Sequence, residues 1–229
     1  MIEFRNVEKR YDDQTAGSAL TDFNLTIGDG EFVFIIGESG AGKSTLLRLL
    51  MGEEKPTKGS VVVDGVNVGR IRPAKLPYYR RHFGMVYQDF RLLKDYTVYE
   101  NVAFAQRVVG ASPQGMKRRI PKILETVGMA DKADSLPSQL SGGEQQRAAI
   151  ARAVVNGPMY LLADEPTGNL DPAGSEEVLR LLESINRGGT TVIVVTHDAA
   201  VVDKARKRVV TLRDGSVVSD VKEGGYGDA

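Results

Sequence analysis

The sequence has no cysteine and no tryptophan, and it has only two histidines among its 229 residues. The lack of cysteine excludes disulfide bonds and thiolate metal sites, and it fits a reducing compartment. An excess of either charge is also lacking, because 30 Lys and Arg residues balance 30 Asp and Glu residues. Nucleic-acid-binding proteins usually carry a basic excess, so this balance argues against that class.

Long hydrophobic runs are lacking as well. Apolar runs such as 32–36 and 192–195 fall far short of the roughly 20 residues that span a bilayer. Met1 leads into an alternating, strand-like segment that lacks the apolar core of a signal peptide. We therefore expect a chain that does not cross a membrane by itself. Its length is enough for one substantial core, or for a core with a lobe.

Three unbroken apolar runs, at 32–36, 160–163 and 191–195, predict strands that are buried on both faces, as in a parallel sheet. Segments with helical periodicity lie between these runs. This alternation predicts an α/β domain. Near the end of the chain, Asp214-Gly215 predicts the turn of a closing hairpin.

The stretch 88–155 differs from the rest, because it has helical periodicity and no buried-strand run. We interpret it as a helical lobe inserted into a core of residues 1–87 and 156–222. The glycine-rich end, 223–229, predicts a flexible tail.

A glycine-rich loop follows the first predicted strand and opens a predicted helix. It reads Gly37-Glu38-Ser39-Gly40-Ala41-Gly42-Lys43-Ser44 and is followed by Thr45, which gives the G-x-x-x-x-G-K-S pattern in the context that it requires. Glycines there let main-chain N–H groups wrap a phosphate. Lys43 adds a positive charge for the β- and γ-phosphates, and Ser44 offers a hydroxyl to Mg²⁺. The loop therefore predicts a nucleoside triphosphate site.

Two carboxylates follow the second predicted strand, and a histidine follows the third. Asp164 and Glu165 lie where open α/β sheets bind ligands. We expect Asp164 to hold Mg²⁺ through water and Glu165 to polarise the attacking water. The alternative is a pair of solvated charges that opens a loop. For His197 at the same edge, position alone favours a structural role.

A second glycine-rich helix start lies about a hundred residues after the phosphate loop. Leu140-Ser141-Gly142-Gly143-Glu144 predicts a helix whose capping box is formed by Ser141 and Glu144. Two glycines here cost helix stability but let an anion approach the helix start. One triphosphate cannot easily fill two separated sites. The phosphate is therefore expected to belong to a second copy of the chain.

These motifs resemble, in their order, those of the nucleotide-binding domains of ABC transporters: a phosphate loop, LSGGEQQR, LLADEPTGNLD and a strand that ends in histidine. The resemblance covers essentially the whole chain. It implies an α/β P-loop ATPase with a mixed or parallel core sheet, an antiparallel β-subdomain and an inserted helical lobe. It also implies ATP and Mg²⁺ as ligands, and a head-to-tail homodimer in which Ser141–Glu144, the signature segment, completes the partner's site.

The resemblance also implies roles for further residues. Tyr11 resembles the aromatic residue that stacks on adenine, with an ordinary half-buried tyrosine as the alternative. Gln88 resembles the glutamine that joins core to lobe and senses Mg²⁺ and the γ-phosphate, and His197 resembles the histidine that contacts the γ-phosphate. Asn169 and Asp171 match a loop that crosses the dimer interface. It reads Gly-Asn-Leu-Asp here, where many relatives have Ser-Ala-Leu-Asp.

Within the family, the stretches 31–34, 87–93, 97–104 and 151–156 resemble the FtsE group of cell-division ATP-binding proteins. This resemblance implies signalling through an FtsX-like transmembrane partner to a cell-wall hydrolase that cleaves septal peptidoglycan. It also implies a place on the cytoplasmic face of the cell membrane, at the division site.

A groove near Gln88 is the candidate dock for a short helix of that partner. The alternative is that the apolar residues of the groove pack the lobe's own core. The candidate contacts are Phe90, Leu92, Leu93 and Tyr96.

Three other functions remain open. Lipoprotein-releasing and macrolide-efflux ATPases share Gly-Asn-Leu-Asp, so an exporter ATPase is the nearest alternative. An ABC module that acts on DNA or ribosomes would carry coiled-coil or zinc insertions or a second cassette, and the sequence shows none of these. A catalytically silent binding module is the third, although the expected site residues are all present: Lys43, Ser44, Asp164, Glu165 and His197.

Overall fold

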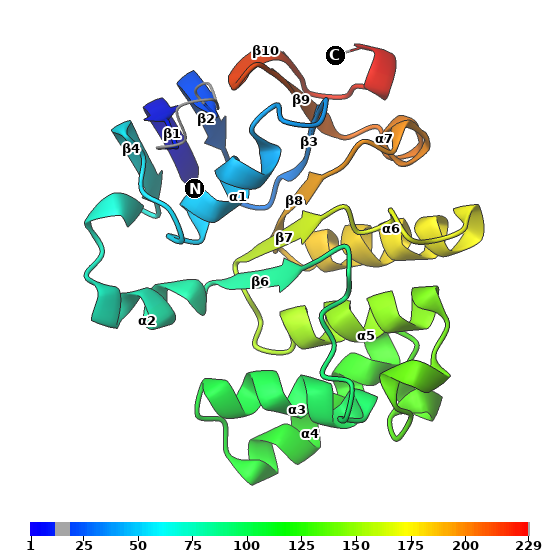
Figure 1. Ribbon diagram of the computed structural model, residues 1–229. Helices are drawn as coiled ribbons and strands as arrows, with labels where there is room; N and C mark the ends of the chain where they lie inside the picture. Colours follow the sequence, from blue (N-terminus) through cyan, green and yellow to red (C-terminus); the bar gives the residue numbers. More distant parts are fainter. Residues whose placement is uncertain (12–18, 229) are drawn as a thin grey trace.

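The computed structural model describes residues 1–11 and 19–228. Its larger sheet has the strand order β10-β9-β3-β8-β7-β6 (Figure 1). The antiparallel pair in this sheet is formed by β9 and β10 (Ser216–Val221), and the other neighbouring strands pair in parallel. This arrangement confirms the predicted α/β core with a mixed sheet. The parallel strands are β3 (Phe32–Gly37), β6 (Phe83–Val86), β7 (Tyr160–Asp164), β8 (Thr191–Val195) and β9 (Arg208–Arg213).

A smaller antiparallel sheet covers one face of the larger one, with α1 (Lys43–Leu50) in the same apolar cluster. Alternation along β3 divides the core, since Val33 and Ile35 face this cluster while Phe34 faces the other. The small sheet is the predicted antiparallel β-subdomain. It has the order β2-β1-β4-β5, formed by β1 (Ile2–Lys9), β2 (Leu20–Ile27), β4 (Lys58–Val63) and β5 (Val66–Asn67).

Helices cover the opposite face of the larger sheet and form the far end of the molecule. α6 (Pro172–Arg187) and α7 (Ala199–Ala205) contribute to the second apolar cluster. α3 (Val98–Val108) and α4 (Pro113–Thr126) lie at the end away from the small sheet (Figure 1). Among the described residues, none of the helices combines the length and the apolar character that a membrane crossing needs.

α5 (Gly142–Val154) joins these two regions, since it contacts α3 and α4 as well as β6. Gly84 of β6 lies so close to α5 that a Cβ there would be 2.5 Å from the Ala153 carbonyl oxygen. The helix that carries the signature segment is therefore anchored on the core sheet. The division into core and lobe at residues 88 and 155 stays a prediction.

Two features differ from the sequence prediction. β6 and the short α2 (Leu76–Arg80) were not predicted. β6 has only four residues and is interrupted by Gly84, so it gives no clear strand pattern. The chain end up to residue 228 is docked on α7, whereas a flexible tail was predicted. The main-chain N–H of Tyr226 donates to Asp203 of α7 over 2.6 Å, and Asp228 pairs with Arg206. Ala229 lies outside the described residues.

Candidate functional site

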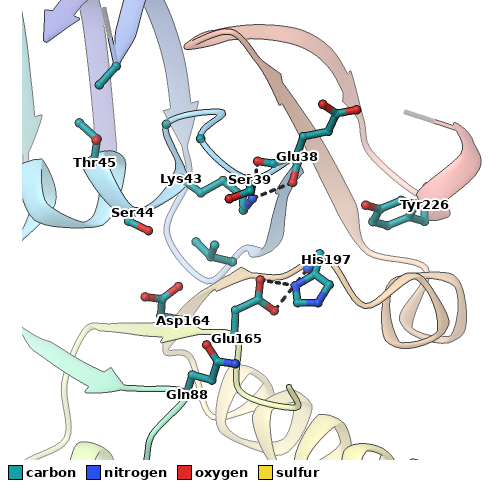
Figure 2. Close-up of a pocket in the computed structure, with 15 residues that line it drawn as sticks. Glu38, Ser39, Lys43, Ser44, Thr45, Gln88, Asp164, Glu165, His197 and Tyr226 are labelled. Carbon is teal, nitrogen blue, oxygen red and sulfur yellow. Dashed lines mark hydrogen bonds and ion pairs between the residues drawn. The ribbon is translucent and has the colours of Figure 1, made fainter. Parts of the chain in front are cut away.

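A cavity of about 600 Å³ lies at the carboxyl ends of β3, β7 and β8, where open α/β sheets bind ligands (Figure 2). The phosphate loop forms one wall and the residues after β7 and β8 form the other. Of the predicted loop residues 37–45, all line the cavity except Ala41, which is buried beside it. The lining residues outside this loop are Ala19, Gln88, Asp164, Glu165, Val195, His197 and Tyr226.

The glycines of the phosphate loop are there for steric reasons. Gly37 has a φ of 146°, and a Cβ on it would lie 2.3 Å from the Leu212 carbonyl oxygen. Gly42 has a φ of 104°, a left-handed conformation that L side chains rarely adopt. The loop curls around Lys43, whose Nζ donates to the carbonyl oxygens of Gly37 at 2.6 Å and Glu38 at 2.9 Å. A bound phosphate would offer this ammonium group a charged acceptor in place of neutral ones.

Glu165 and His197 are in direct contact, which the sequence did not predict. His197 Nδ1 lies 2.6 Å from Glu165 Oε1, and their side chains point toward one another (Figure 2). Glu165 Oε2 accepts hydrogen bonds from the Thr196 hydroxyl at 3.1 Å and from the His197 main chain at 3.3 Å. Glu165 itself has a φ of 48°, which is a costly conformation that tends to occur at functional sites.

Asp164 ends β7 and faces the same cavity as Ser44 and Lys43. Burial raises the pKa of the Asp164 carboxyl, and the negative charge of Glu165 raises it further. An ionised Asp164 is therefore costly in the isolated chain, and a cation beside it would relieve that cost. Gln88 lies on the same side of the cavity, below Asp164 and Glu165 in Figure 2.

Tyr11, like Ala41, is a predicted nucleotide-binding residue that lies outside the cavity lining. Its hydroxyl is 3.3 Å from the Thr45 hydroxyl of α1, and the Lys9 ammonium lies 4.8 Å from its ring centre. The ring is thus next to the phosphate loop, with one face near a cation. Stacking of Tyr11 on adenine stays a prediction.

The signature segment also lies outside the cavity lining, which includes none of the described residues Ser141–Glu144. The predicted capping box is confirmed: the Ser141 hydroxyl accepts from the Glu144 N–H at 3.3 Å, and the Glu144 carboxylate accepts from the Ser141 N–H at 2.8 Å. The Ser141 hydrogen bonds lower the pKa of Glu144. The first N–H groups of α5, at Gly142 and Gly143, have no acceptor within their own helix.

The loop predicted to cross a dimer interface lies between β7 and α6. Asp171 caps α6, because its carboxylate accepts from the Gly174 N–H at 2.8 Å. Asn169 reaches Gln88, because its Nδ2 donates to the Gln88 carbonyl at 2.8 Å. This loop therefore contacts Gln88, a residue of the cavity lining, within one chain.

The predicted partner dock follows Gln88 and is partly buried. Phe90 and Leu93 are half-buried, Leu92 packs on the apolar core, and Tyr96 is exposed. The buried side chain of Asn101 holds this segment, because it bonds both the N–H and the carbonyl of Leu93. The contact of Leu92 with the apolar core favours a packing role for that residue. Docking at the other three stays a prediction.

Tyr226 is a site residue that sequence reasoning missed. It comes from the docked chain end, and its hydroxyl points toward the phosphate loop and His197 (Figure 2). Gly225 makes this docking possible, since a Cβ there would lie 2.5 Å from the Asp203 carboxylate. The available signal was the pair of glycines that flanks Tyr226, which looked like a mobile tail.

Comparisons with known proteins agree with this geometry. The sequence model of the ABC transporter family matches residues 20–168. The cell division ATP-binding protein FtsE of Mycobacterium tuberculosis is 53% identical over 227 residues, which cover 99% of this chain and 98% of that protein. FtsE of Escherichia coli strain K12 is 48% identical over 215 residues, which cover 94% of this chain and 96% of that protein.

Two solved structures of the ABC transporter cassette MJ0796 are also similar. A dimeric structure is 39% identical with a TM-score of 0.87, and it covers 99% of this chain and 100% of that chain. A dimeric post-hydrolysis state, bound to ADP and Pi, has the same identity and coverage and a TM-score of 0.84. From the full-length similarity and the P-loop site, the chain belongs to the ABC transporter family, as an ATP-binding and ATP-hydrolysing cassette of the FtsE type.

Proposed function

We propose that two copies of this chain close head to tail on ATP, and that each signature segment completes the site of the other copy. The observation that carries this proposal is the split between Lys43, inside the cavity, and Ser141, outside it. Both segments are built for anions, yet one chain offers a single triphosphate cradle. The dimeric structures of the similar MJ0796 cassette support a dimer of this chain.

Within each composite site, the phosphate loop holds the β- and γ-phosphates, and Lys43 exchanges its carbonyl acceptors for phosphate oxygens. Glu165 orients the attacking water and accepts a proton as water adds to the γ-phosphorus, so that ATP and water give ADP and phosphate. His197, which already bonds Glu165, holds that carboxylate in place and contacts the γ-phosphate. Tyr11 stacks on the adenine from outside the cavity.

The oxygen-rich side of the cavity fits Mg²⁺, because Ser44, Asp164 and Gln88 all present oxygen atoms and line one cavity. The raised pKa of Asp164 marks a carboxylate that gains from a nearby cation. We propose that Ser44 and Gln88 bind the ion directly and Asp164 through water. When bound, Mg²⁺ neutralises charge that develops on the phosphates.

Closure of the dimer then changes the conformation of a membrane partner. The cell division names of the relatives support an FtsX-like transmembrane protein as this partner. Through it, opening and closing would regulate a hydrolase of septal peptidoglycan outside the cell. The cassette would then sit on the cytoplasmic face of the membrane at the division site, with Phe90, Leu93 and Tyr96 as the dock.

The dimer is tested by the ATPase rate per chain, measured over a range of protein concentration. We expect the rate to rise with concentration and then level off, because the site is complete only in the dimer. Ser141→Arg should abolish the rise, since a bulky cation replaces the small residue at the helix start. Arg180→Ala, on the exposed face of α6, is the control and should behave as the wild type. A concentration-independent rate that survives Ser141→Arg would contradict the proposal.

The dock is tested separately, by co-purification of the membrane partner with Phe90→Ala/Leu93→Ala. We expect the partner to be lost while ATP binding by the isolated chain is kept. Intact co-purification would place the dock elsewhere.

A further inference from the structure

Gln88 stands in an irregular turn that receives its support from other parts of the chain. Its side chain is exposed, it lies in the loop between β6 and α3, and two residues that follow Asp89 have left-handed conformations. These residues, Phe90 and Arg91, have φ values of 57° and 47°. Such conformations persist only where neighbouring groups hold them. Arg152 of α5 supplies one such contact, because its guanidinium donates to the carbonyls of both residues.

The interface loop supplies the contacts at Gln88 itself. Asn169 Nδ2 donates to the Gln88 carbonyl at 2.8 Å. Gly168 lies next to the amide group of Gln88, and a Cβ on Gly168 would be 3.1 Å from Gln88 Nε2. Asn169 thus holds the main chain of Gln88, and Gly168 leaves space for the Gln88 side chain. Both contacts come from the two positions at which this loop departs from Ser-Ala-Leu-Asp.

The same loop also touches the start of the signature helix. A Cβ on Gly142 would lie 3.4 Å from Leu170 Cδ2 and 3.5 Å from the Asn169 carbonyl oxygen. The loop 168–170 is therefore packed between Gln88 and the signature segment of its own chain. A displacement of this loop moves Gln88 relative to the cavity, because the bond to its carbonyl is direct.

We propose that Gly168 and Asn169 are positioning residues for Gln88, and that they set its distance from Mg²⁺ and the γ-phosphate. This inference rests on the proposed role of Gln88 in the ATP site. A side chain at 168 would touch the Gln88 amide, and an alanine at 169 could not hold the Gln88 carbonyl. A displacement of the interface loop on dimer closure would then move Gln88 in the same chain.

The first experiment measures binding of a non-hydrolysable ATP analogue as a function of Mg²⁺ concentration. In Asn169→Ala, the Mg²⁺ concentration at half-saturation should rise about fivefold, the effect of one lost hydrogen bond. Gly168→Ser should shift it in the same direction by displacing the Gln88 amide. The matched control is Asn156→Ala, which removes one bond from an asparagine Nδ2 to a carbonyl, at Ala105, away from the cavity. The control should leave the Mg²⁺ dependence unchanged.

A double-mutant cycle separates positioning from general damage. In a Gln88→Ala background, Asn169→Ala should add no further shift, because the side chain that it positions is gone. Equal shifts in both backgrounds, or no shift in the wild-type background, would overturn the inference.

Hydrogen exchange tests the contact without any ligand. The amides of 87–93 should exchange faster in Asn169→Ala than in the wild type or in Asn156→Ala, because the turn loses a support. Unchanged exchange would also overturn the inference. A wild-type chain that shows neither Mg²⁺-dependent binding nor turnover would contradict the proposed function itself, and that outcome is distinct from these two.

Discussion

The phosphate loop and the signature segment are both glycine-rich helix starts, but their glycines serve different needs. In the phosphate loop, Gly37 and Gly42 have positive φ values and stand where a Cβ would collide with main-chain oxygens. In the signature segment neither glycine has a positive φ, and a Cβ on Gly143 would meet its nearest neighbour, the Arg147 guanidinium, at 3.8 Å. The fold requires the first set. The glycines of the signature segment are not required by the fold and leave space for a ligand from outside the chain.

The carboxylates of the cavity and of the signature segment also differ in their electrostatics. The carboxylate of Asp164 faces the cavity with its pKa raised, whereas the signature carboxylate of Glu144 is satisfied by its capping box and has its pKa lowered. Burial disfavours the charged form of the Asp164 carboxylate in the cavity, so binding of a cation together with a nucleotide would stabilise that form. The signature half is complete as a helix start, with spare N–H groups at Gly142 and Gly143. We infer that the cavity residues catalyse hydrolysis and that the signature segment contributes to binding.

The largest expected effect separates chemistry from binding. Glu165→Gln should lower the ATPase rate by about 10²–10⁴-fold, because a neutral amide cannot accept the proton from water. Affinity for ATP should stay within a few-fold of the wild type, since the phosphate loop is untouched. Phosphate release and equilibrium binding of ATP measure the two quantities. Glu183→Gln, on α6 away from the cavity, is the control. A normal rate in Glu165→Gln would assign the chemistry to another group.

A pair of glycine substitutions probes the fold requirement. Gly42→Ala should lower the free energy of unfolding by about 1–3 kcal/mol, because it forces a left-handed alanine against Ala19 and Leu20. Gly143→Ala should leave it unchanged or raise it by up to about 1 kcal/mol, since alanine favours the helix and has room there. Urea unfolding of the nucleotide-free chain measures both. Equal losses in the two variants would remove the distinction between the two segments.

The smallest expected effect concerns the two carboxylates. The raised pKa of Asp164 means that stability is lost as pH rises from its ordinary value of 3.8 through the raised one. Asp164→Asn should therefore stabilise the nucleotide-free chain at pH 7, and the gain should shrink toward pH 4. The lowered pKa of Glu144 gives the opposite sign, so Glu144→Gln should slightly destabilise the chain at pH 7. The urea midpoints of both variants at pH 7 and pH 4 measure these effects. If both substitutions stabilised the chain at pH 7, or both destabilised it, the contrast between the two carboxylates would be contradicted.

Much of the fold and the cavity followed from local sequence signals. Buried apolar runs predicted β3, β7 and β8, and the carboxyl ends of these strands place the phosphate loop, Asp164 and His197 in one cavity. The capping box of Ser141 and Glu144 was equally readable, because it depends on residues three apart.

What could not be predicted depends on contacts between distant segments. The bond between Glu165 and His197 joins two strand ends, and the bond from Asn169 to Gln88 joins two loops that are 81 residues apart. β6 is too short to give a periodic signal, and its Gly84 reflects the close approach of α5. The glycines around Tyr226 looked like a mobile tail, although a Cβ on Gly225 would lie 2.5 Å from the Asp203 carboxylate.

The central claim, that ATP is shared between two chains, is tested most directly by sedimentation of the Glu165→Gln chain with and without ATP and Mg²⁺. Slow hydrolysis should trap the closed state, so the chain should sediment as a monomer without nucleotide and as a dimer with it. The double variant Ser141→Arg/Glu165→Gln should bind ATP through its intact phosphate loop and stay monomeric. An ATP-saturated Glu165→Gln chain that remains a monomer at every concentration, or a dimer that forms equally well with Ser141→Arg, would contradict the account.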